Sequence, residues 1–275
     1  TGGTDMAGLS LQHIFKKYDN GFEAVKDFNL EIEDKEFIIF VGPSGCGKST
    51  LLKSLNRMND LVEGCRIEGG VYLDGTDIYK DINVNILRKR VGMVFQKPNV
   101  FPMSIYDNVA YGPRIHGIKS KLKLDEIVES SLRKAAIWDE CKDRLRKSAL
   151  GMSGGQQQRL ALGKVLLTKP EILLLDEPTK GMDGGFKVKF GAMLRELKKQ
   201  GITTVLVSHD MEFCAEYATY CGLMFDREII SFGPTREFFA ENVYYTTAAA
   251  RMTRGILKDC LVAEDIMAAL EKGRA

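Results

Sequence analysis

Residues 42–49 form a pattern that binds phosphate groups. They match Gly-x-x-x-x-Gly-Lys-Ser/Thr in full, and they lie between the apolar run 37–41 and a stretch that can form a helix. Glycines let backbone amides turn toward phosphate oxygens, and the helix N-terminus adds its positive end at the same place. We therefore expect a nucleoside triphosphate to bind to Gly42, Pro43, Ser44, Gly45, Cys46, Gly47, Lys48, Ser49 and Thr50.

Four side chains in and beyond this loop can supply the chemistry. Lys48 is expected to contact the β- and γ-phosphates and to assist catalysis, and the Ser49 hydroxyl is placed to ligate Mg²⁺. The apolar run 172–175 ends in Asp176 and Glu177, so both carboxylates emerge at the sheet edge where open α/β sheets bind ligands. We expect Asp176 to hold Mg²⁺ directly or through another ligand, and Glu177 to accept a proton from the attacking water or to orient it.

A second anion site is indicated by the Ser-Gly-Gly-Gln string within residues 150–159. Ser153 is a natural N-cap before a helix that runs through 160–167, and Gly154 and Gly155 leave the amides of that helix start open. The string, which includes Gln156, resembles the signature of the ABC ATPase family, with Met152 where leucine is commonest. The site has no lysine or acids of its own, which suggests that it completes a nucleotide site formed elsewhere; in this family, that site belongs to the partner subunit.

Further residues match the family in their order along the chain. By this resemblance, Gln96 touches Mg²⁺ or water and senses the membrane subunits, and Asp183 crosses a dimer interface. His209, after the predicted strand 203–207, resembles the histidine that contacts the γ-phosphate. Tyr18 lies where the family places an aromatic ring under adenine, a stacking contact of roughly 1 to 3 kcal/mol; Phe15 and Phe22 are close enough to be alternatives.

The resemblance implies an α/β fold, that of a P-loop NTPase with a mixed or parallel sheet core, an antiparallel β subdomain and an α-helical subdomain. It also implies ATP and Mg²⁺ as cofactors, and a head-to-tail dimer with two shared ATP sites. The second ATPase subunit would be a copy or a close relative of this chain. Separate transmembrane permease subunits would convert dimer closure into transport.

The pattern of apolar residues agrees with such an organisation. Unbroken apolar runs predict strands buried on both faces, and helical spacing with many charges over 121–145 predicts an amphipathic insert. We expect a cloning remnant at 1–5, the ATPase domain at 6–262 with its helical subdomain at about 97–160, and a C-terminal helix or tail at 263–275. The predicted strands are 9–13, 28–32, 37–41, 71–73, 91–95, 172–175 and 203–207.

Bulk properties exclude several other classes of protein. A net charge of +2 gives no electrostatic reason to expect nucleic acid as a partner, and no apolar run approaches the roughly 18 to 20 residues that cross a bilayer. The six cysteines are scattered without a Cys-x-x-Cys pair, which supports neither a zinc site nor a disulfide framework. We expect a cytoplasmic protein that lies peripherally on the inner face of the cell membrane.

The transported substrate is indicated by segments that resemble different subfamilies. Residues up to about 52 look like sugar-importer ATPases, about 55–160 resemble phosphate-importer ATPases, and 245–252 look like energy-coupling-factor ATPases of vitamin or cobalt/nickel uptake. The chain therefore looks composite, either an engineered chimera or a recombined sequence. Because the middle segment faces the permease in this family, it favours an importer of inorganic phosphate. A soluble ABC ATPase is disfavoured, since neither a long coiled-coil insertion nor a second ATPase domain is present.

Overall fold

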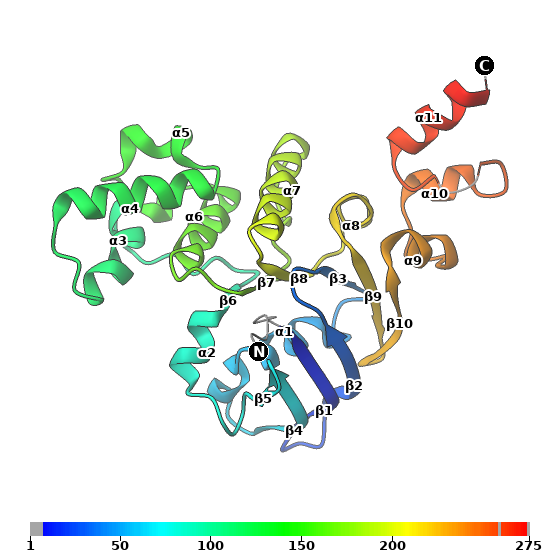
Figure 1. The fold of residues 1–275 in the computed structure, drawn as a ribbon, viewed down its shortest axis with the longest axis horizontal. Coiled ribbons are helices and arrows are strands. Elements are labelled where there is room, and N and C mark those ends of the chain that lie inside the picture. The colour runs from blue at the N-terminus through cyan, green and yellow to red at the C-terminus, as the bar shows by residue number, and fades with distance from the viewer. Residues whose placement is uncertain (1–7, 258–259, 274–275) are drawn as a thin grey trace, which may run out of the picture.

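Two sheets and a peripheral group of helices build the protein, as Figure 1 shows. The computed structural model describes residues 8–257 and 260–273, so the predicted remnant at 1–5 lies outside the described residues. The strands are β1 (Leu9–Tyr18), β2 (Glu23–Ile32), β3 (Phe37–Val41), β4 (Cys65–Leu73), β5 (Thr76–Asp77), β6 (Val91–Val94), β7 (Ile172–Asp176), β8 (Thr203–Val207), β9 (Tyr220–Phe225) and β10 (Glu228–Pro234). The α-helices are α1 (Lys48–Leu55), α2 (Val84–Arg90), α3 (Ile105–Ile115), α4 (Lys121–Lys134), α5 (Trp138–Cys141), α6 (Gly154–Leu166), α7 (Gly184–Lys199), α8 (Met211–Tyr217), α9 (Thr235–Glu241), α10 (Ala248–Thr253) and α11 (Ala263–Gly273).

The larger sheet has six strands in the order β10-β9-β3-β8-β7-β6. Strands β9, β3, β8, β7 and β6 run parallel, and β10 pairs antiparallel with β9. Every residue of β3, β7 and β8 is buried, as the unbroken apolar runs predicted. Because the three strands are parallel neighbours, their C-terminal ends meet at one edge, and the segments that follow them can form one site.

The smaller sheet is antiparallel, with the order β2-β1-β4-β5. Its buried side chains share one core with a face of the larger sheet and with α1. Strands β1, β2 and β4 are longer than the predicted ranges because polar residues continue the pairing beyond the apolar part, with irregular register between Leu11 and Lys17. Strands β5, β9 and β10 were not among the predicted strands.

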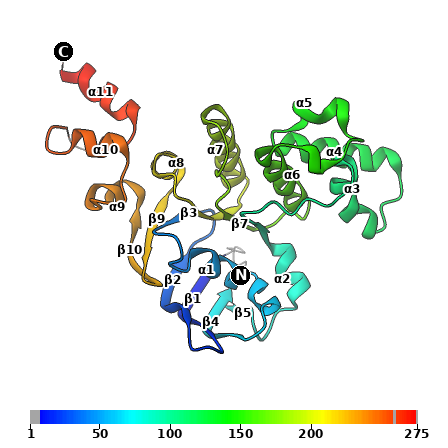
Figure 2. The ribbon, with the colours of Figure 1, turned by 180° about the vertical axis from the view of Figure 1, so that it is seen from behind.

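The helices α3, α4, α5 and α6 pack around a hydrophobic cluster of their own, drawn from residues 105–160. They gather on one side of the larger sheet in both views (Figures 1 and 2). The predicted amphipathic stretch 121–145 is not one helix. The chain turns after α4 because Ala136 adopts a left-handed φ of 51°, and the Ile137 amide donates to the Leu132 carbonyl, which closes the helix end.

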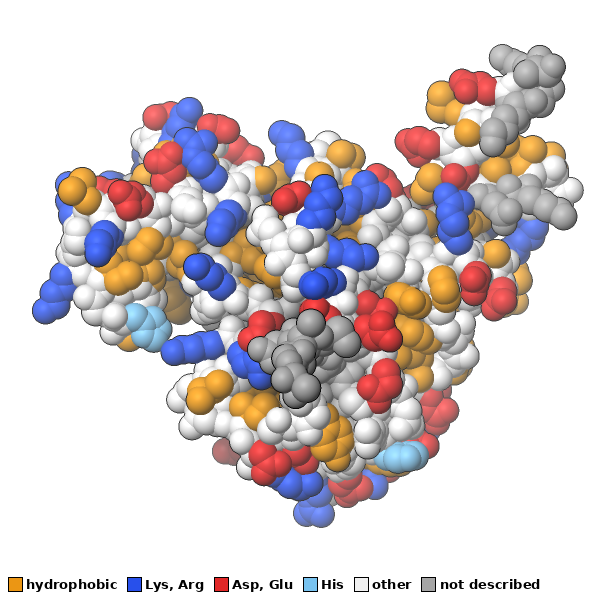
Figure 3. Space-filling view, viewed as in Figure 1, with side chains coloured by type: hydrophobic (Ala, Val, Ile, Leu, Met, Phe, Trp, Pro, Cys, Tyr) orange, Lys and Arg blue, Asp and Glu red, His pale blue; other side chains and the backbone are white. Residues whose placement is uncertain are grey.

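The C-terminal part extends from the opposite side of the larger sheet, where α10 and α11 project from the main body (Figure 3). The same view shows basic side chains gathered over α7. The helix predicted at the C-terminus is present as α11. Within residues 8–257 and 260–273, no helix has the length and apolar character needed to cross a bilayer.

Candidate ATP-hydrolysing site

The phosphate loop joins the end of β3 to the start of α1. Gly42 and Gly47 have φ values of 143° and 100°, a region that favours glycine, and Gly47 caps α1. A side chain at Gly42 would collide with the Met224 carbonyl, and one at Gly47 with the Ala24 carbonyl. The two glycines therefore allow the loop to pack closely against the backbone of β9 and β2.

Lys48 spans this loop from the first turn of α1. Its Nζ donates to the carbonyl oxygens of Gly42 at 2.9 Å and Pro43 at 2.8 Å, and it lies 3.5 Å from Sγ of Cys46. The Lys48 and Cys46 side chains are both buried. The ammonium is thus held at the start of α1, where it adds to the positive end of the helix.

The Ser49 hydroxyl donates to Oδ1 of Asp176 at 2.7 Å, and this bond joins the start of α1 to the end of β7. Hydroxyl and carboxylate oxygens are ligands that Mg²⁺ prefers, and this ion usually takes only one or two protein ligands beside phosphate and water. No group of three or more His, Cys, Asp or Glu residues suited to a metal occurs among the described residues. The donor set fits Mg²⁺ bound together with a triphosphate.

Glu177 follows β7 in a strained conformation and faces His209, which follows β8. Its φ of 50° is rare for a residue with a side chain, and its amide donates to the Val207 carbonyl at 3.0 Å. Nε2 of His209 lies 2.9 Å from Oε1 of Glu177. Burial raises the pKa of Glu177 above its usual value despite the nearby Lys48 ammonium. Burial, with the charges of Lys48 and Lys180, lowers the pKa of His209.

A cavity of about 280 Å³ brings most of the predicted residues together. Phe15 is not among its lining residues, whereas Phe22 is, with its ring centroid 6.1 Å from that of Tyr18. The residues that line it are Tyr18, Phe22, Ala24, Ser44, Gly45, Gly47, Lys48, Ser49, Thr50, Gln96, Glu177 and His209. Ala24 was missed by sequence reasoning because only the packing of β2 against the phosphate loop places it there.

The Ser-Gly-Gly-Gln string lies in a different place, at the start of α6. Ser153 and Gln156 form a capping box: the serine Oγ accepts from the Gln156 amide, and the glutamine side chain accepts from the Ser153 amide. Ser153, Gln156 and Asp183 line a cavity of about 430 Å³ that shares no lining residue with the first. Asp183 caps α7 by accepting from the Phe186 amide at 2.9 Å.

An ion pair that sequence reasoning missed holds the start of α6. The buried Arg159 donates to both carboxylate oxygens of Glu140 in α5, at 2.5 and 3.1 Å, and its guanidinium lies 3.6 Å from the centroid of the Phe186 ring. Gln156 also donates to Glu140, at 2.9 Å. No spacing in the sequence signals this contact, because the two charged residues are 19 positions apart on separate helices.

Comparison with known proteins agrees with this geometry. The ABC transporter family model matches residues 25–180. The chain belongs to the ABC transporter ATPase family. The phosphate import ATP-binding protein PstB 3 of Streptococcus pneumoniae serotype 4 is 49% identical over 235 residues, which cover 85% of this chain and 93% of that protein.

Two solved ABC ATPase structures resemble this chain over most of its length. The ATP-binding cassette MJ0796, a dimer in a post-hydrolysis state bound to ADP and Pi, has a TM-score of 0.72 at 29% identity, covering 83% of this chain and 99% of that one. CbiO1 of Clostridium perfringens, part of the ABC transporter complex CbiONQ, has a TM-score of 0.74 at 27% identity, covering 96% and 98%. This ABC ATPase therefore has the predicted fold, binds ATP and hydrolyses it.

Proposed function

We propose that this ABC ATPase drives the import of inorganic phosphate through separate membrane subunits, on the inner face of the cell membrane. The observation that carries this proposal is the 49% identity to a phosphate import ATP-binding protein. The family resemblance of the middle segment, about 55–160, supports the same substrate. This segment includes α3, α4, α5 and the first half of α6.

Each ATP site is formed by two copies of the chain. The first cavity carries the phosphate loop, whereas the start of α6 opens on the separate second cavity. A second copy arranged head to tail brings its Ser153 helix start to the triphosphate bound by Lys48 of the first copy. The dimeric state of the similar MJ0796 structure with ADP and Pi supports this arrangement.

The residues of the first cavity divide the work of hydrolysis. Mg²⁺ held by Ser49 and Asp176, with Gln96 nearby, would neutralise charge on the β- and γ-phosphates. Lys48 adds a fixed positive charge to the same oxygens. Glu177 orients the attacking water and accepts its proton, since its raised pKa brings its basicity closer to neutral pH. His209 holds Oε1 of Glu177 and stands at the γ-phosphate side.

The permease contacts a groove on the helical group. A cavity of about 800 Å³ lies between α3, α4 and the end of α6, and it combines apolar side chains such as Phe101 and Tyr111 with Lys134 and Lys164. The segment with Gln96 leads from β6 to this groove. Binding of the permease in the groove can therefore change the position of Gln96 at the ATP site. An acidic, amphipathic segment of a permease fits such a surface.

Transport in living cells tests the proposed substrate. The chain replaces PstB 3 in a Streptococcus pneumoniae strain without other phosphate-importer ATPases, and uptake of radioactive phosphate is measured. We expect uptake from the wild-type chain and none from the Glu177→Gln variant, produced at the same level. A chain that hydrolyses ATP and associates with the permease, yet restores no uptake, would contradict phosphate as the substrate.

Uptake of cobalt, nickel or a vitamin is the second candidate. It is favoured by one observation: the similarity to CbiO1 covers 96% of this chain, a larger part than residues 25–180, which the family model matches. Uptake of radioactive cobalt is measured in the same cells, supplied with the CbiO partner proteins, and it distinguishes the two candidate substrates. Cobalt uptake without phosphate uptake would select this alternative.

A further inference from the structure

Lys16 in β1 is a buried lysine. Its side chain is among the largest that are fully buried, with 1% of the residue exposed. No ion pair among the described residues includes Lys16. Burial of an unpaired ammonium group is costly, so the groups that surround it must compensate.

Two contacts supply this compensation. Nζ of Lys16 donates to Oδ1 of Asn59 at 2.8 Å, and it lies 4.7 Å from the centroid of the Tyr18 ring. An ammonium over an aromatic face is attracted by the negative face of the ring, most strongly where water is excluded. Lys16 thus holds one face of the ring that lines the ATP cavity.

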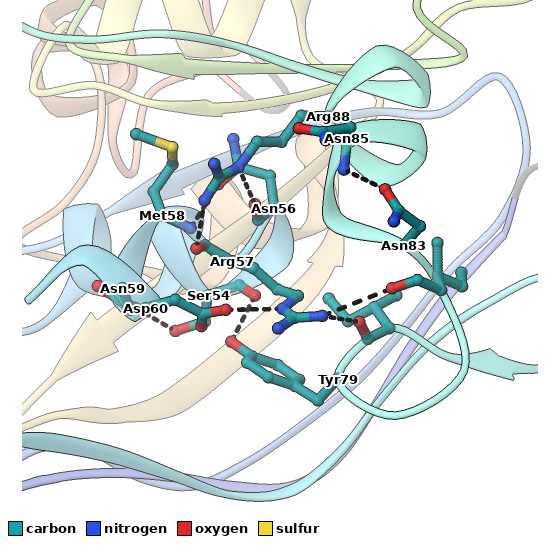
Figure 4. A network of polar contacts seen from close by, with 12 residues as sticks. Ser54, Asn56, Arg57, Met58, Asn59, Asp60, Tyr79, Asn83, Asn85 and Arg88 are labelled. Atoms are coloured by element: carbon teal, nitrogen blue, oxygen red, sulfur yellow. Dashed lines mark hydrogen bonds and ion pairs between the residues drawn. The ribbon is translucent and has the colours of Figure 1, made fainter.

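Asn59 connects this contact to the helix that carries the phosphate loop. Its side-chain amide donates to the Thr50 carbonyl at 3.1 Å and to Oγ of Ser54 at 2.7 Å. Figure 4 shows Ser54 and Asn59 within the polar network at the end of α1. Asn59 is itself 1% exposed, and its carbonyl accepts from Sγ of Cys65 in β4, the strand beside β1. A continuous chain of buried contacts therefore runs from Tyr18 through Lys16 and Asn59 to α1.

This chain of contacts bridges two parts of the molecule that bind different parts of ATP. Tyr18 lies at the end of β1 in the antiparallel sheet, whereas Lys48 and Ser49 lie at the start of α1, beside the larger sheet. A base and a triphosphate joined by one ribose bind both parts together only if the two parts keep a fixed separation. A rigid link removes the cost of ordering them on binding.

We propose that Lys16 is a positioning residue for nucleotide binding, which sets the Tyr18 ring relative to α1 so that the adenine base and the triphosphate are held at the same time. This inference rests on the proposed role of Tyr18 at the base. Lys16 does not touch ATP in this scheme. Its effect reaches the nucleotide through Tyr18 on one side and through Asn59 on the other.

The test compares two ligands that share the phosphates but not the base. Binding of ATP and of inorganic tripolyphosphate is measured by calorimetry in the Glu177→Gln background, with and without Lys16→Met. We expect Lys16→Met to weaken ATP binding by about 3- to 30-fold, the range of cation–π contacts from exposed to desolvated. Tripolyphosphate binding should stay unchanged. Unchanged tripolyphosphate binding also shows that the phosphate loop is folded. Equal losses for both ligands, or no loss for ATP, overturn the proposal.

Lys17 supplies a matched control one position along the same strand. Its side chain points to the exposed face, where Nζ pairs with Glu68 at 3.0 Å and lies over the Phe15 ring instead of Tyr18. Lys17→Met removes the same charge and should leave both affinities at the wild-type values. Should Lys16→Met fail to fold, Lys16→Gln takes its place with the same expected pattern, because glutamine can keep the hydrogen bond to Asn59 without a cation over the ring.

A double substitution separates an effect through Tyr18 from general damage. Tyr18→Ala should weaken ATP binding by about 5- to 100-fold, the value of one stacked base. Addition of Lys16→Met to Tyr18→Ala should then cause less than about a 2-fold further loss, because the ring that Lys16 positions is gone. Independent losses that multiply in the double variant overturn the proposal. If Tyr18→Ala alone has no effect, the role of Tyr18 at the base has failed as well.

Discussion

Nε2 of His209 lies 2.9 Å from Oε1 of Glu177, and the two residues follow neighbouring parallel strands. Glu177 is 11% exposed at its side chain and His209 46%, so the histidine is on the open side of the pair. The lowered pKa of His209 keeps the ring neutral near pH 7, where it can donate one hydrogen bond to the carboxylate. The carboxylate is therefore held in place without being neutralised by a full positive charge.

Replacement of the carboxylate tests its role as the base. Glu177→Gln should slow ATP hydrolysis by about 10²- to 10⁴-fold, because an amide cannot accept the proton of water. ATP binding should persist and trap a dimer that elutes earlier in size-exclusion chromatography. Glu196→Gln, at an exposed pair with Lys199 on α7, is the matched control and should hydrolyse ATP at the wild-type rate.

As the pH is lowered, the rate of hydrolysis should begin to fall at a higher pH than expected for a glutamate with the usual pKa. Burial raises the pKa of Glu177 above 4.5, so the carboxylate takes up its proton earlier as the pH falls. We expect kcat, measured with saturating ATP from about pH 8 down to pH 4.5, to decline through this raised pKa. A profile that stays flat down to pH 4.5 would show that protonation of Glu177 does not limit the reaction.

Loss of the loop lysine should weaken ATP binding itself. Lys48→Ala removes a buried ammonium held at the start of α1, and we expect about 10- to 100-fold weaker ATP binding, the value of one or two charge-assisted hydrogen bonds. The measurement is binding of a fluorescent ATP analogue. Lys53→Ala, on the same helix but outside the cavity, should bind ATP with the wild-type affinity. Equal affinity of all three proteins would show that Lys48 does not contribute to ATP binding.

Ser49→Ala should raise the Mg²⁺ concentration at which hydrolysis is half-maximal. The change removes one oxygen and leaves Asp176 without its 2.7 Å hydrogen bond. Loss of a hydrogen bond that orients a metal ligand typically lowers metal affinity by about 10-fold. A titration of activity with Mg²⁺ at fixed ATP measures the shift. The same half-maximal concentration in both proteins would exclude Ser49 as a ligand.

The ion pair at the start of α6 should contribute stability that depends on pH. The hydrogen bond from Arg159 lowers the pKa of Glu140 below its usual value of 4.5. The stability that this ion pair adds to the fold is therefore fully present above pH 4.5, and it is lost as the pH falls through the lowered pKa. At pH 7, Glu140→Gln should lower the melting temperature by about 1 to 3 °C, a small change because the carboxylate is partly exposed. The difference should shrink at acidic pH.

The neighbouring pair Glu129–Arg133 provides the control for this measurement. It is an exposed pair on α4 with an N–O distance of 2.7 Å, and Glu129→Gln should change the melting temperature by less than about 1 °C. If the two variants melt alike at neutral pH, the buried guanidinium of Arg159 does not stabilise the start of α6.

The amino-acid sequence by itself was enough to predict which residues act near the phosphates. The phosphate loop follows the unbroken apolar run of β3, and Asp176 and Glu177 follow that of β7. The structure places these two strands on either side of β8, with their ends at one edge. Local patterns suffice here because a buried parallel strand and the segment that follows it are contiguous in the chain. The N-cap at Ser153 was predictable for the same reason, since a capping box spans only four residues.

Only the tertiary structure decided the contacts between distant segments. The sequence left Phe15, Tyr18 and Phe22 as alternatives for the base, and the register of β1 with β2 and β4 puts Tyr18 and Phe22, but not Phe15, at the cavity. The buried Lys16 and its bond to Asn59, 43 positions away, follow from that same packing. Such contacts depend on the relative position of whole sheets and helices, and a one-residue change in register would turn each side chain to the opposite face.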